Sequence, residues 1–285
     1  MNQLISHKNI PLVGKHSKPI VTDFIYSDTS EPKPVVVFCH GYKGYKDWGA
    51  WQLMLKEIAK QGNFVVAFNF SHNGGTIEQP IDFPDLEAFG NDNFSKQQDD
   101  LQSVIDEVLS SEFKFASHVN VNSVTIIGHS RGGAMAMIKA AEENKITKVI
   151  TLASISTYET SFPKGEELKK WEKEGVRYIT NGRTKQEMPL YYQLFENFKE
   201  NKERFNGANA AVKLEVPHLI VHGTKDTSVT IDNAELIHSK SKKSEYFVLD
   251  TDHVFGAKQP WESSKMPEAL EVTTKRIIEF LSSKN

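Results

Sequence analysis

Short apolar runs that alternate with helix-like stretches constrain this chain more than any other feature. Each run is four to six residues long, rich in β-branched or aromatic side chains, and bounded by polar or turn residues. The runs are residues 35–39, 64–68, 124–127, 148–153, 218–222 and 245–249. Helical spacing of apolar residues occurs at 51–59, 101–109, 132–143, 231–239 and 266–281. Nearly continuous apolarity over so few residues is typical of strands buried on both faces. The alternation predicts an α/β fold with a mostly parallel, doubly wound sheet.

Two segments depart from this alternation. The alternating pattern at residues 20–25 predicts an antiparallel strand at one edge of the sheet. Residues 154–213 contain charged, helix-prone stretches and no convincing buried strand, and they are too many for a connecting loop. We therefore expect a helical cap, or lid, at residues 154–213, inserted into a core formed by residues 1–153 and 214–285.

Composition limits the class of protein and its partners. With 39% hydrophobic and 25% charged residues, the chain has the composition of a soluble globular protein. Its 34 basic and 37 acidic residues give a net charge of −3, which provides no electrostatic reason to expect nucleic acid or a membrane as partner. The single cysteine, Cys39, excludes an internal disulfide and a cysteine metal site. Without a long apolar run or a secretory signal, we expect a cytoplasmic monomer or homodimer.

The motif Gly128-His129-Ser130-Arg131-Gly132 follows a predicted strand and precedes a predicted helix. A serine at such a tight turn is exposed at the carboxyl edge of the sheet and needs small residues on both sides. The pattern also arises by chance in glycine-rich turns, but its position between a strand and a helix favours a catalytic nucleophile. Ser130 is the predicted nucleophile.

A serine hydroxyl needs a base, and the base needs an orienting acid, expected downstream in the order serine, acid, histidine. His253 is the predicted base, because it follows the last predicted strand in a loop at the carboxyl edge. Asp226 is the predicted acid, because it follows the preceding strand directly. Asp250 and Asp252 are the alternative candidates for the acid. Asp252 is adjacent to His253 in sequence, so its side chain should point away from the ring, and Asp250 is expected to close the strand or cap the loop.

Backbone N–H groups are expected to bind the oxyanion of the tetrahedral intermediate. One should come from Arg131, after the nucleophile, and a second from Tyr42, in the loop after an earlier strand. His40 either braces this loop or contacts the substrate. A phosphate-binding reading of the loop fails because the final Lys-Ser/Thr of that motif is absent. No metal-ligand spacing or dinucleotide fingerprint is present in the sequence, so we expect neither metal nor cofactor.

Together, these motifs resemble the α/β-hydrolase fold superfamily over residues 15–283. The resemblance is carried by His40-Gly41, Phe68–Gly74, Gly128–Gly132, Gly223–Asp226 and Asp252-His253, and it is strongest to bacterial esterases of the cinnamoyl/feruloyl and dienelactone-hydrolase-like type. The resemblance implies a triad of Ser130, Asp226 and His253 and a lid over the acyl pocket. Many relatives have Gly-His-Gly where this chain has Ser71-His72-Asn73-Gly74, a turn that is structural in the family.

Nine of the sixty residues in the insertion are aromatic, and some of them could line a pocket for an apolar or aromatic group. Tyr191 and Tyr192 are the candidates for substrate contact. The predicted activity is hydrolysis of small carboxylic esters through an acyl-enzyme on Ser130. A peptidase, amidase or thioesterase would use the same triad, and a non-catalytic binding module on this fold is the alternative of another class. Dehalogenase chemistry is disfavoured, because it needs a carboxylate at position 130.

Overall fold

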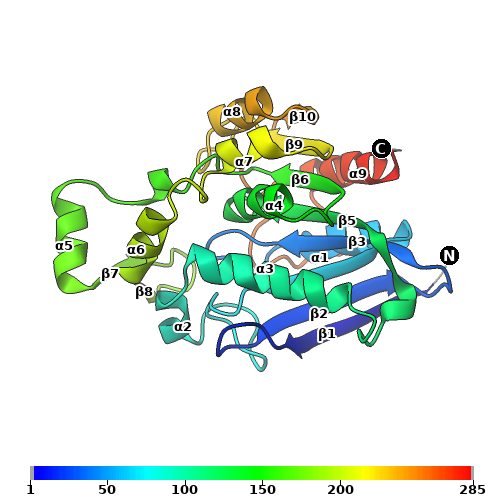
Figure 1. The fold of residues 1–285 in the computed structure, drawn as a ribbon, viewed down its shortest axis with the longest axis horizontal. Helices are drawn as coiled ribbons and strands as arrows, with labels where there is room; N and C mark the ends of the chain where they lie inside the picture. The colour runs from blue at the N-terminus through cyan, green and yellow to red at the C-terminus, as the bar shows by residue number, and fades with distance from the viewer. Residues whose placement is uncertain (1–2, 284–285) are drawn as a thin grey trace.

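The computed structural model describes residues 3–283, and its main feature is an eight-stranded sheet. The strands lie in the order β1-β2-β4-β3-β5-β6-β9-β10 (Figure 1). Their bounds are β1 Leu4–Leu12, β2 Ile20–Ser27, β3 Lys33–Cys39, β4 Phe64–Asn69, β5 Val119–His129, β6 Lys148–Leu152, β9 His218–Gly223 and β10 Ser244–Leu249. All pairs from β4 to β10 are parallel, whereas β1–β2 and β2–β4 are antiparallel. The predicted mostly parallel sheet is thus confirmed.

The position of the antiparallel strand was predicted wrongly. The pattern at 20–25 does form antiparallel β2, but β1 covers it and forms the edge of the sheet. Every residue of β2 is buried, so its polar alternation does not mark a solvent-facing side. In β1, eight of the nine residues are exposed or half-buried, and its apolar and polar residues form neither a continuous apolar run nor a strict alternation, which is why its sequence gives a weak strand signal.

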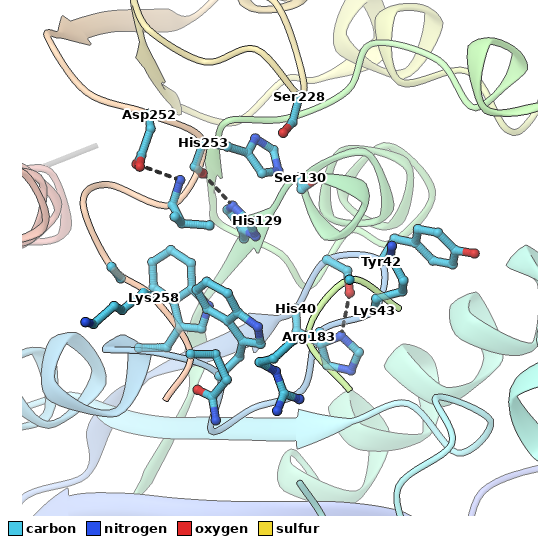
Figure 2. Close-up of a pocket in the computed structure, with 18 of the residues that line it drawn as sticks. His40, Tyr42, Lys43, His129, Ser130, Arg183, Ser228, Asp252, His253 and Lys258 are labelled. Atoms are coloured by element: carbon cyan, nitrogen blue, oxygen red, sulfur yellow. Dashed lines mark hydrogen bonds between the residues drawn. The ribbon is translucent and has the colours of Figure 1, made fainter. Parts of the chain in front are cut away.

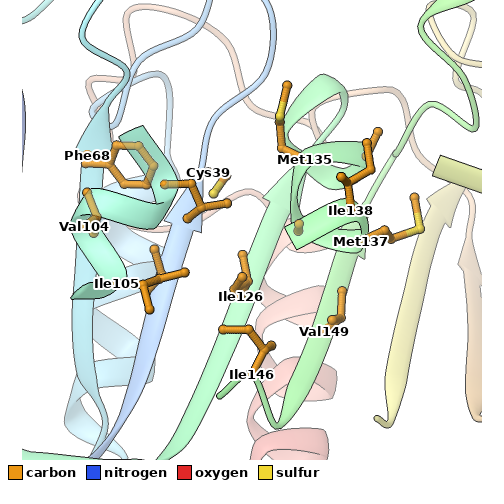
Figure 3. Close-up of a cluster of buried hydrophobic side chains, with 14 of the residues drawn as sticks. Cys39, Phe68, Val104, Ile105, Ile126, Met135, Met137, Ile138, Ile146 and Val149 are labelled. Carbon is orange, nitrogen blue, oxygen red and sulfur yellow. The ribbon is translucent and has the colours of Figure 1, made fainter. Parts of the chain in front are cut away.

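Helices cover both faces of the sheet and build two apolar layers. On one face lie α3 Phe94–Val108, α4 Arg131–Glu142, α7 Gly207–Lys213 and α8 Asp232–Lys240. On the other lie α1 Trp51–Lys60 and α9 Glu268–Ser282. Figure 3 shows part of the first layer, which contains Val104 and Ile105 of α3, Met135 and Ile138 of α4 and Ile126 of β5. Over the described residues, none of the helices combines the length and apolarity that a membrane crossing requires.

The segment predicted to be a helical cap is only partly helical. It contains the 3₁₀ turn η2 (Glu159–Ser161), α5 (Glu166–Glu174), α6 (Gln193–Glu200) and α7, but also an antiparallel hairpin of β7 (Val176–Thr180) and β8 (Glu187–Tyr191). These strands are short and half exposed, and β8 contains Pro189, so they lack the continuous apolar run of a buried strand. Figure 1 shows α5, α6, β7 and β8 together beyond one end of the sheet.

Polar side chains tie this segment to the start of α3 and to the region before it, which includes the short α2 (Leu86–Gly90). Asn93 donates from Nδ2 to Oε1 of Gln193 at 2.7 Å, and Asn197 donates from Nδ2 to Oγ of Ser95 at 2.7 Å. The turn between β7 and β8 is held by an ion pair of Arg183 with Asp82. A further 3₁₀ turn, η1 (Ala116–His118), precedes β5.

Candidate active site

Ser130 occupies the turn that joins β5 to α4, at the carboxyl edge of the sheet. Its φ of 55° and ψ of −119° are strained for a residue with a side chain. The backbone N–H of Ser130 donates to the carbonyl of Leu152 at 2.8 Å, which fixes the turn to the end of β6. A strained strand-to-helix turn that presents a serine is the geometry expected of a nucleophile elbow.

Two glycines of the motif permit this turn by close backbone approach. A Cβ on Gly128 would lie 2.1 Å from the carbonyl oxygen of Gly132. A Cβ on Gly132 would lie 2.4 Å from the carbonyl oxygen of Cys39, at the end of β3. Because these obstacles are backbone atoms, any side chain at either position would force α4 away from the sheet.

Asp226 and His253 form a hydrogen-bonded pair at the same edge. The loop after β9 carries Asp226, the loop after β10 carries His253, and Nδ1 of His253 lies 2.7 Å from Oδ2 of Asp226. Next to a carboxylate, Nδ1 carries the proton and leaves Nε2 as an acceptor. The Asp226 side chain is fully buried, whereas that of His253 is 19% exposed, so the ring can meet a ligand.

The Asp226 carboxylate is held by three further donors. Its Oδ1 accepts the backbone N–H groups of Ser228 at 2.9 Å and Val229 at 2.8 Å. Nε2 of the buried His222 lies 3.3 Å from Oδ2 and 2.8 Å from the carbonyl of Val229, so this nitrogen is protonated. Burial alone would raise the pKa of Asp226, but the hydrogen bonds from His222, His253 and Val229 hold that pKa well below its usual range.

Ser130 and His253 border the same two cavities, and Figure 2 shows them side by side. Among residues 3–283 no hydrogen bond joins the Ser130 hydroxyl to His253. Catalytic hydrogen bonds are often long in the absence of substrate and tighten when it binds. The fold thus brings Ser130, Asp226 and His253, which are distant in sequence, to one edge of the sheet.

Two backbone donors flank the serine. Within the described chain, the N–H groups of Tyr42 and Arg131 form no hydrogen bond, and Arg131 is the first residue of α4, where N–H groups lack partners inside the helix. The loop that carries Tyr42 lies against the nucleophile, because a Cβ on Gly41 would be 3.0 Å from that of Ser130. Both residues also line the cavity nearest α5 and α6.

Two buried histidines brace the loops around the serine. Nε2 of His129 donates to the carbonyl of His253 at 2.9 Å, and this ring packs on Trp51 with centroids 4.9 Å apart. His40 lies between the carbonyl of Gly41, 2.9 Å from Nδ1, and the N–H of Phe70, 3.4 Å from Nε2. Burial lowers the pKa of His129 to about 3 and that of His40 to about 4, so both rings are neutral. His40 borders the larger cavity while bracing its loop.

The two cavities differ in their walls. The larger, about 670 Å³, extends from Ser130 toward Trp48, Lys258 and the β7–β8 turn. The smaller, about 390 Å³, extends toward the inserted segment and is named here the cap-side cavity. Its apolar lining comprises Ile155, Phe162, Trp171, Ile179, Leu190, Leu194 and Val229. The two cavities share Tyr42, Lys43, Ser130, Ser228 and His253, so Ser130 lies where the two cavities meet.

Tyr191 and Tyr192 lie outside both cavities, contrary to the expectation from sequence. The hydroxyl of Tyr191 donates to Glu87, and its ring packs on Gly90. The ring of Tyr192 stands edge-on to Trp171, with centroids 5.5 Å apart. Tyr191 therefore packs against α2 and Tyr192 packs within the inserted segment, and neither borders the cavities at Ser130.

Some residues at the site were not identified from the sequence. His222 stands four positions before Asp226, in a segment that was interpreted as the end of a strand. The turn residues Asn181, Gly182 and Arg183 reach the larger cavity only because the hairpin folds back over the sheet edge. No local sequence signal identifies these three turn residues as part of the site. In the part of the chain described, no cluster of three or more His, Cys, Asp or Glu side chains is placed to hold a metal ion.

Comparison with known proteins agrees with this architecture. Residues 34–178, just over half of the chain, match the alpha/beta hydrolase fold family. A Bacillus subtilis protein named uncharacterized peptidase YtmA is 24% identical over 177 residues, an alignment that spans 61% of this chain and 61% of the relative.

Solved structures extend the match to nearly the whole chain. Est1E from Butyrivibrio proteoclasticus has a TM-score of 0.71 at 16% identity and covers 96% of this chain and 98% of its own. Est1E with ferulic acid bound gives a TM-score of 0.68 at 16% identity, covering 93% and 94% of the two chains. The esterase domain of a Rhodothermus marinus protein gives 0.63 at 16% identity, covering 98% and 97%. The chain belongs to the alpha/beta hydrolase fold family.

Proposed function

We propose that this protein is a serine hydrolase that cleaves carboxylic esters through an acyl-enzyme on Ser130. The observation that carries the proposal is that Ser130, in a strained turn, borders the same two cavities as His253, which is hydrogen-bonded to Asp226. The free N–H groups of Tyr42 and Arg131 support it, because acyl transfer needs donors for an oxyanion.

Each proposed residue has one role in acylation. The Oγ of Ser130 attacks the ester carbonyl carbon while Nε2 of His253 accepts its proton. The carbonyl oxygen becomes an oxyanion that accepts hydrogen bonds from the N–H groups of Tyr42 and Arg131. When the tetrahedral intermediate collapses, the carbon–oxygen bond to the alcohol breaks and His253 returns the proton to the leaving oxygen. Asp226 stays ionised and stabilises the imidazolium.

Deacylation repeats the sequence with water. His253 removes a proton from water as it attacks the acyl carbon, the same two N–H groups stabilise the second oxyanion, and His253 then protonates Oγ of Ser130. The acid product leaves and the free serine is restored. No metal or cofactor takes part in these steps.

The cap-side cavity supports a small apolar or aromatic group on the substrate. Its apolar walls include Phe162 and Trp171, and side chains of this kind line most small-molecule sites. The similarity in fold to Est1E, whose structure holds ferulic acid, agrees with an aromatic acyl group.

A peptidase is the second candidate, favoured by one observation. The relative from Bacillus subtilis carries the name of a peptidase, although this chain aligns with only part of it. The same three residues would act on an amide, with His253 protonating an amine. A thioesterase would use the same catalytic steps.

The test is turnover of p-nitrophenyl acetate by wild type and Ser130→Ala. We expect the variant to lose at least about 10³-fold in kcat, because its nucleophile is missing. Ser228→Ala is the matched control, since Ser228 borders both cavities but has no assigned catalytic step. Equal turnover by wild type and Ser130→Ala would refute the proposal, and cleavage of peptide p-nitroanilides in preference to esters would favour the peptidase.

A further inference from the structure

The cap-side cavity contains positive charge that no side chain of its lining balances. Three cationic residues line it, Lys43, Arg131 and Arg177, and no acidic residue does. None of the three forms an ion pair or a side-chain hydrogen bond within residues 3–283. By contrast Arg183, in the larger cavity, is paired with Asp82.

Arg131 is the most unusual of these cations because it is nearly buried. The residue is 8% exposed. Its guanidinium carbon lies 4.0 Å from the ring centroid of Tyr42 and 5.2 Å from that of Phe94. Stacking on aromatic faces supports the plane of a guanidinium but leaves its five in-plane N–H donors unused. A buried arginine without a partner is costly, since arginine does not deprotonate in proteins.

Two further unpartnered polar atoms lie close to Arg131. The hydroxyl of Tyr42 is buried without a hydrogen bond, in a residue that lines the cavity. Oδ1 of Asp92 is also buried without a partner, but Asp92 does not line the cavity and forms no ion pair with Arg131. Burial raises the pKa of Asp92 to about 7, against the influence of Arg131, so this carboxyl balances the arginine incompletely at neutral pH.

Arg177 approaches the same cavity from β7. Its guanidinium carbon lies 5.4 Å from the ring centroid of Trp171, and the residue is partly exposed. Arg131 belongs to the core and Arg177 to the inserted segment, and both influence the Tyr42 hydroxyl electrostatically. A ligand anion between them would satisfy donors from both parts of the protein. The planar fork of arginine fits a carboxylate in particular, because it can donate two parallel hydrogen bonds.

We propose that the cap-side cavity binds the carboxylate of an anionic ester, held by Arg131 and Arg177 with help from the Tyr42 hydroxyl. The apolar walls then contact the hydrocarbon between that carboxylate and the ester bond. This inference rests on the proposed hydrolase function of Ser130 and makes it specific. The substrate class is esters that bear a free carboxylate on one half, such as half-esters of dicarboxylic acids.

The kinetic test compares anionic and neutral esters of matched size. Mono-p-nitrophenyl glutarate and p-nitrophenyl pentanoate differ by a carboxylate on the acyl side. The acetate esters of p-hydroxybenzoate and p-hydroxybenzamide differ on the alcohol side, where a carboxylate in the first is a neutral amide in the second. We expect wild type to favour the anionic member of at least one pair in kcat/KM. The anionic-to-neutral ratio should fall about 10- to 100-fold in Arg131→Gln and in Arg177→Gln.

Controls separate charge recognition from damage to the fold. Arg276→Gln removes an arginine of α9 that is paired with Glu245 and Glu279, and it should keep the wild-type ratio. Arg131→Lys keeps the charge without the fork, so it should restore part of the ratio. A wild-type enzyme that favours neither anionic ester, or variants that retain the preference, would overturn the proposal.

A binding measurement separates this inference from the proposed catalysis. We expect glutarate to bind Ser130→Ala in calorimetric titration, glutaramide to bind at least about tenfold more weakly, and Arg131→Gln to weaken glutarate binding similarly in that background. If no ester is hydrolysed but glutarate binds in this way, the hydrolase proposal fails and the anion site stands. If esters are hydrolysed but glutarate binds neither Ser130→Ala nor wild type, the anion site fails alone.

Discussion

At the scale of single residues, the site depends on how Asp226 is held. Its two carboxylate oxygens receive hydrogen bonds from two backbone N–H groups and two histidines. These donors keep it ionised and fix its direction, so Nδ1 of His253 carries a proton and Nε2 is free to act as a base. The buried His222 is a positioning residue in this arrangement, because it contacts the carboxylate and not the cavity.

Replacement of Asp226 by asparagine should reduce kcat on p-nitrophenyl acetate by about 10³- to 10⁴-fold with little change in fold. An amide can donate to Nδ1 and thereby stabilise the wrong tautomer of His253. Asp250→Asn is the control, because Asp250 is exposed and paired with Lys225. A loss of less than tenfold in Asp226→Asn would show that Asp226 does not orient the base.

At the scale of elements, the junction of β5 and α4 determines where the serine stands. Gly132 brings the first turn of α4 against the end of β3, and the Tyr42 loop that follows β3 contacts Ser130. The spacing of the motif contains this information, which is why the junction could be predicted from sequence. The hairpin of β7 and β8 could not be predicted, because its strands are stabilised by pairing and contacts with distant segments and not by an apolar run.

A methyl group at position 132 should destabilise the protein by about 1–3 kcal/mol or more. In Gly132→Ala the new Cβ would meet the carbonyl of Cys39, and backbone there cannot move without disturbing the sheet. Gly182→Ala is the matched control, since no atom lies within 4 Å of the Cβ position and no positive φ is required. The free energy of unfolding in denaturant measures both. Equal stability of the two variants would contradict the close packing described.

The candidate site also contains residues that local sequence identifies and residues whose placement depends on tertiary contacts. Ser130, Asp226 and His253 could be selected because each follows a recognisable strand, and parallel strands end at one edge. Residue type alone suggested Tyr191 and Tyr192, and the structure places Tyr191 against α2 and Tyr192 against Trp171 of the inserted segment. That Arg131 has no ion-pair partner depends on the tertiary structure, because the sequence does not show which acidic side chains lie near it.

At the scale of the whole molecule, buried titratable groups couple stability to pH in opposite directions. Burial lowers the pKa of His40 and His72 to about 4 and those of His129 and His218 to about 3. Burial raises the pKa of Asp92 and of Asp100 to about 7. Between pH 4 and 6.5 the four histidines bind protons mainly in the unfolded state, whereas the two aspartates bind them mainly in the folded state. The histidines outnumber the aspartates, so acidification should destabilise the protein.

We therefore expect the Tm to fall modestly from pH 6.5 to 4 and more steeply below pH 4. Below pH 4, Asp92 and Asp100 are protonated in both the folded and the unfolded state, so they no longer oppose the histidines. The lowered pKa of Asp226 then adds a further loss of stability. Calorimetry at constant ionic strength measures the curve. Asp100→Asn removes one opposing group and should steepen the decline between pH 4 and 6.5. A Tm that rises on acidification would contradict this assignment of buried groups.

The most direct test of the central claim is the site of covalent modification by a fluorophosphonate. Wild-type protein is labelled, digested and mapped by mass spectrometry, with His253→Ala treated in parallel. We predict a single stoichiometric adduct on Ser130 and labelling at least about 10²-fold slower without the imidazole base. An intact, folded wild type that acquires no adduct, or acquires it on another residue, would contradict the account.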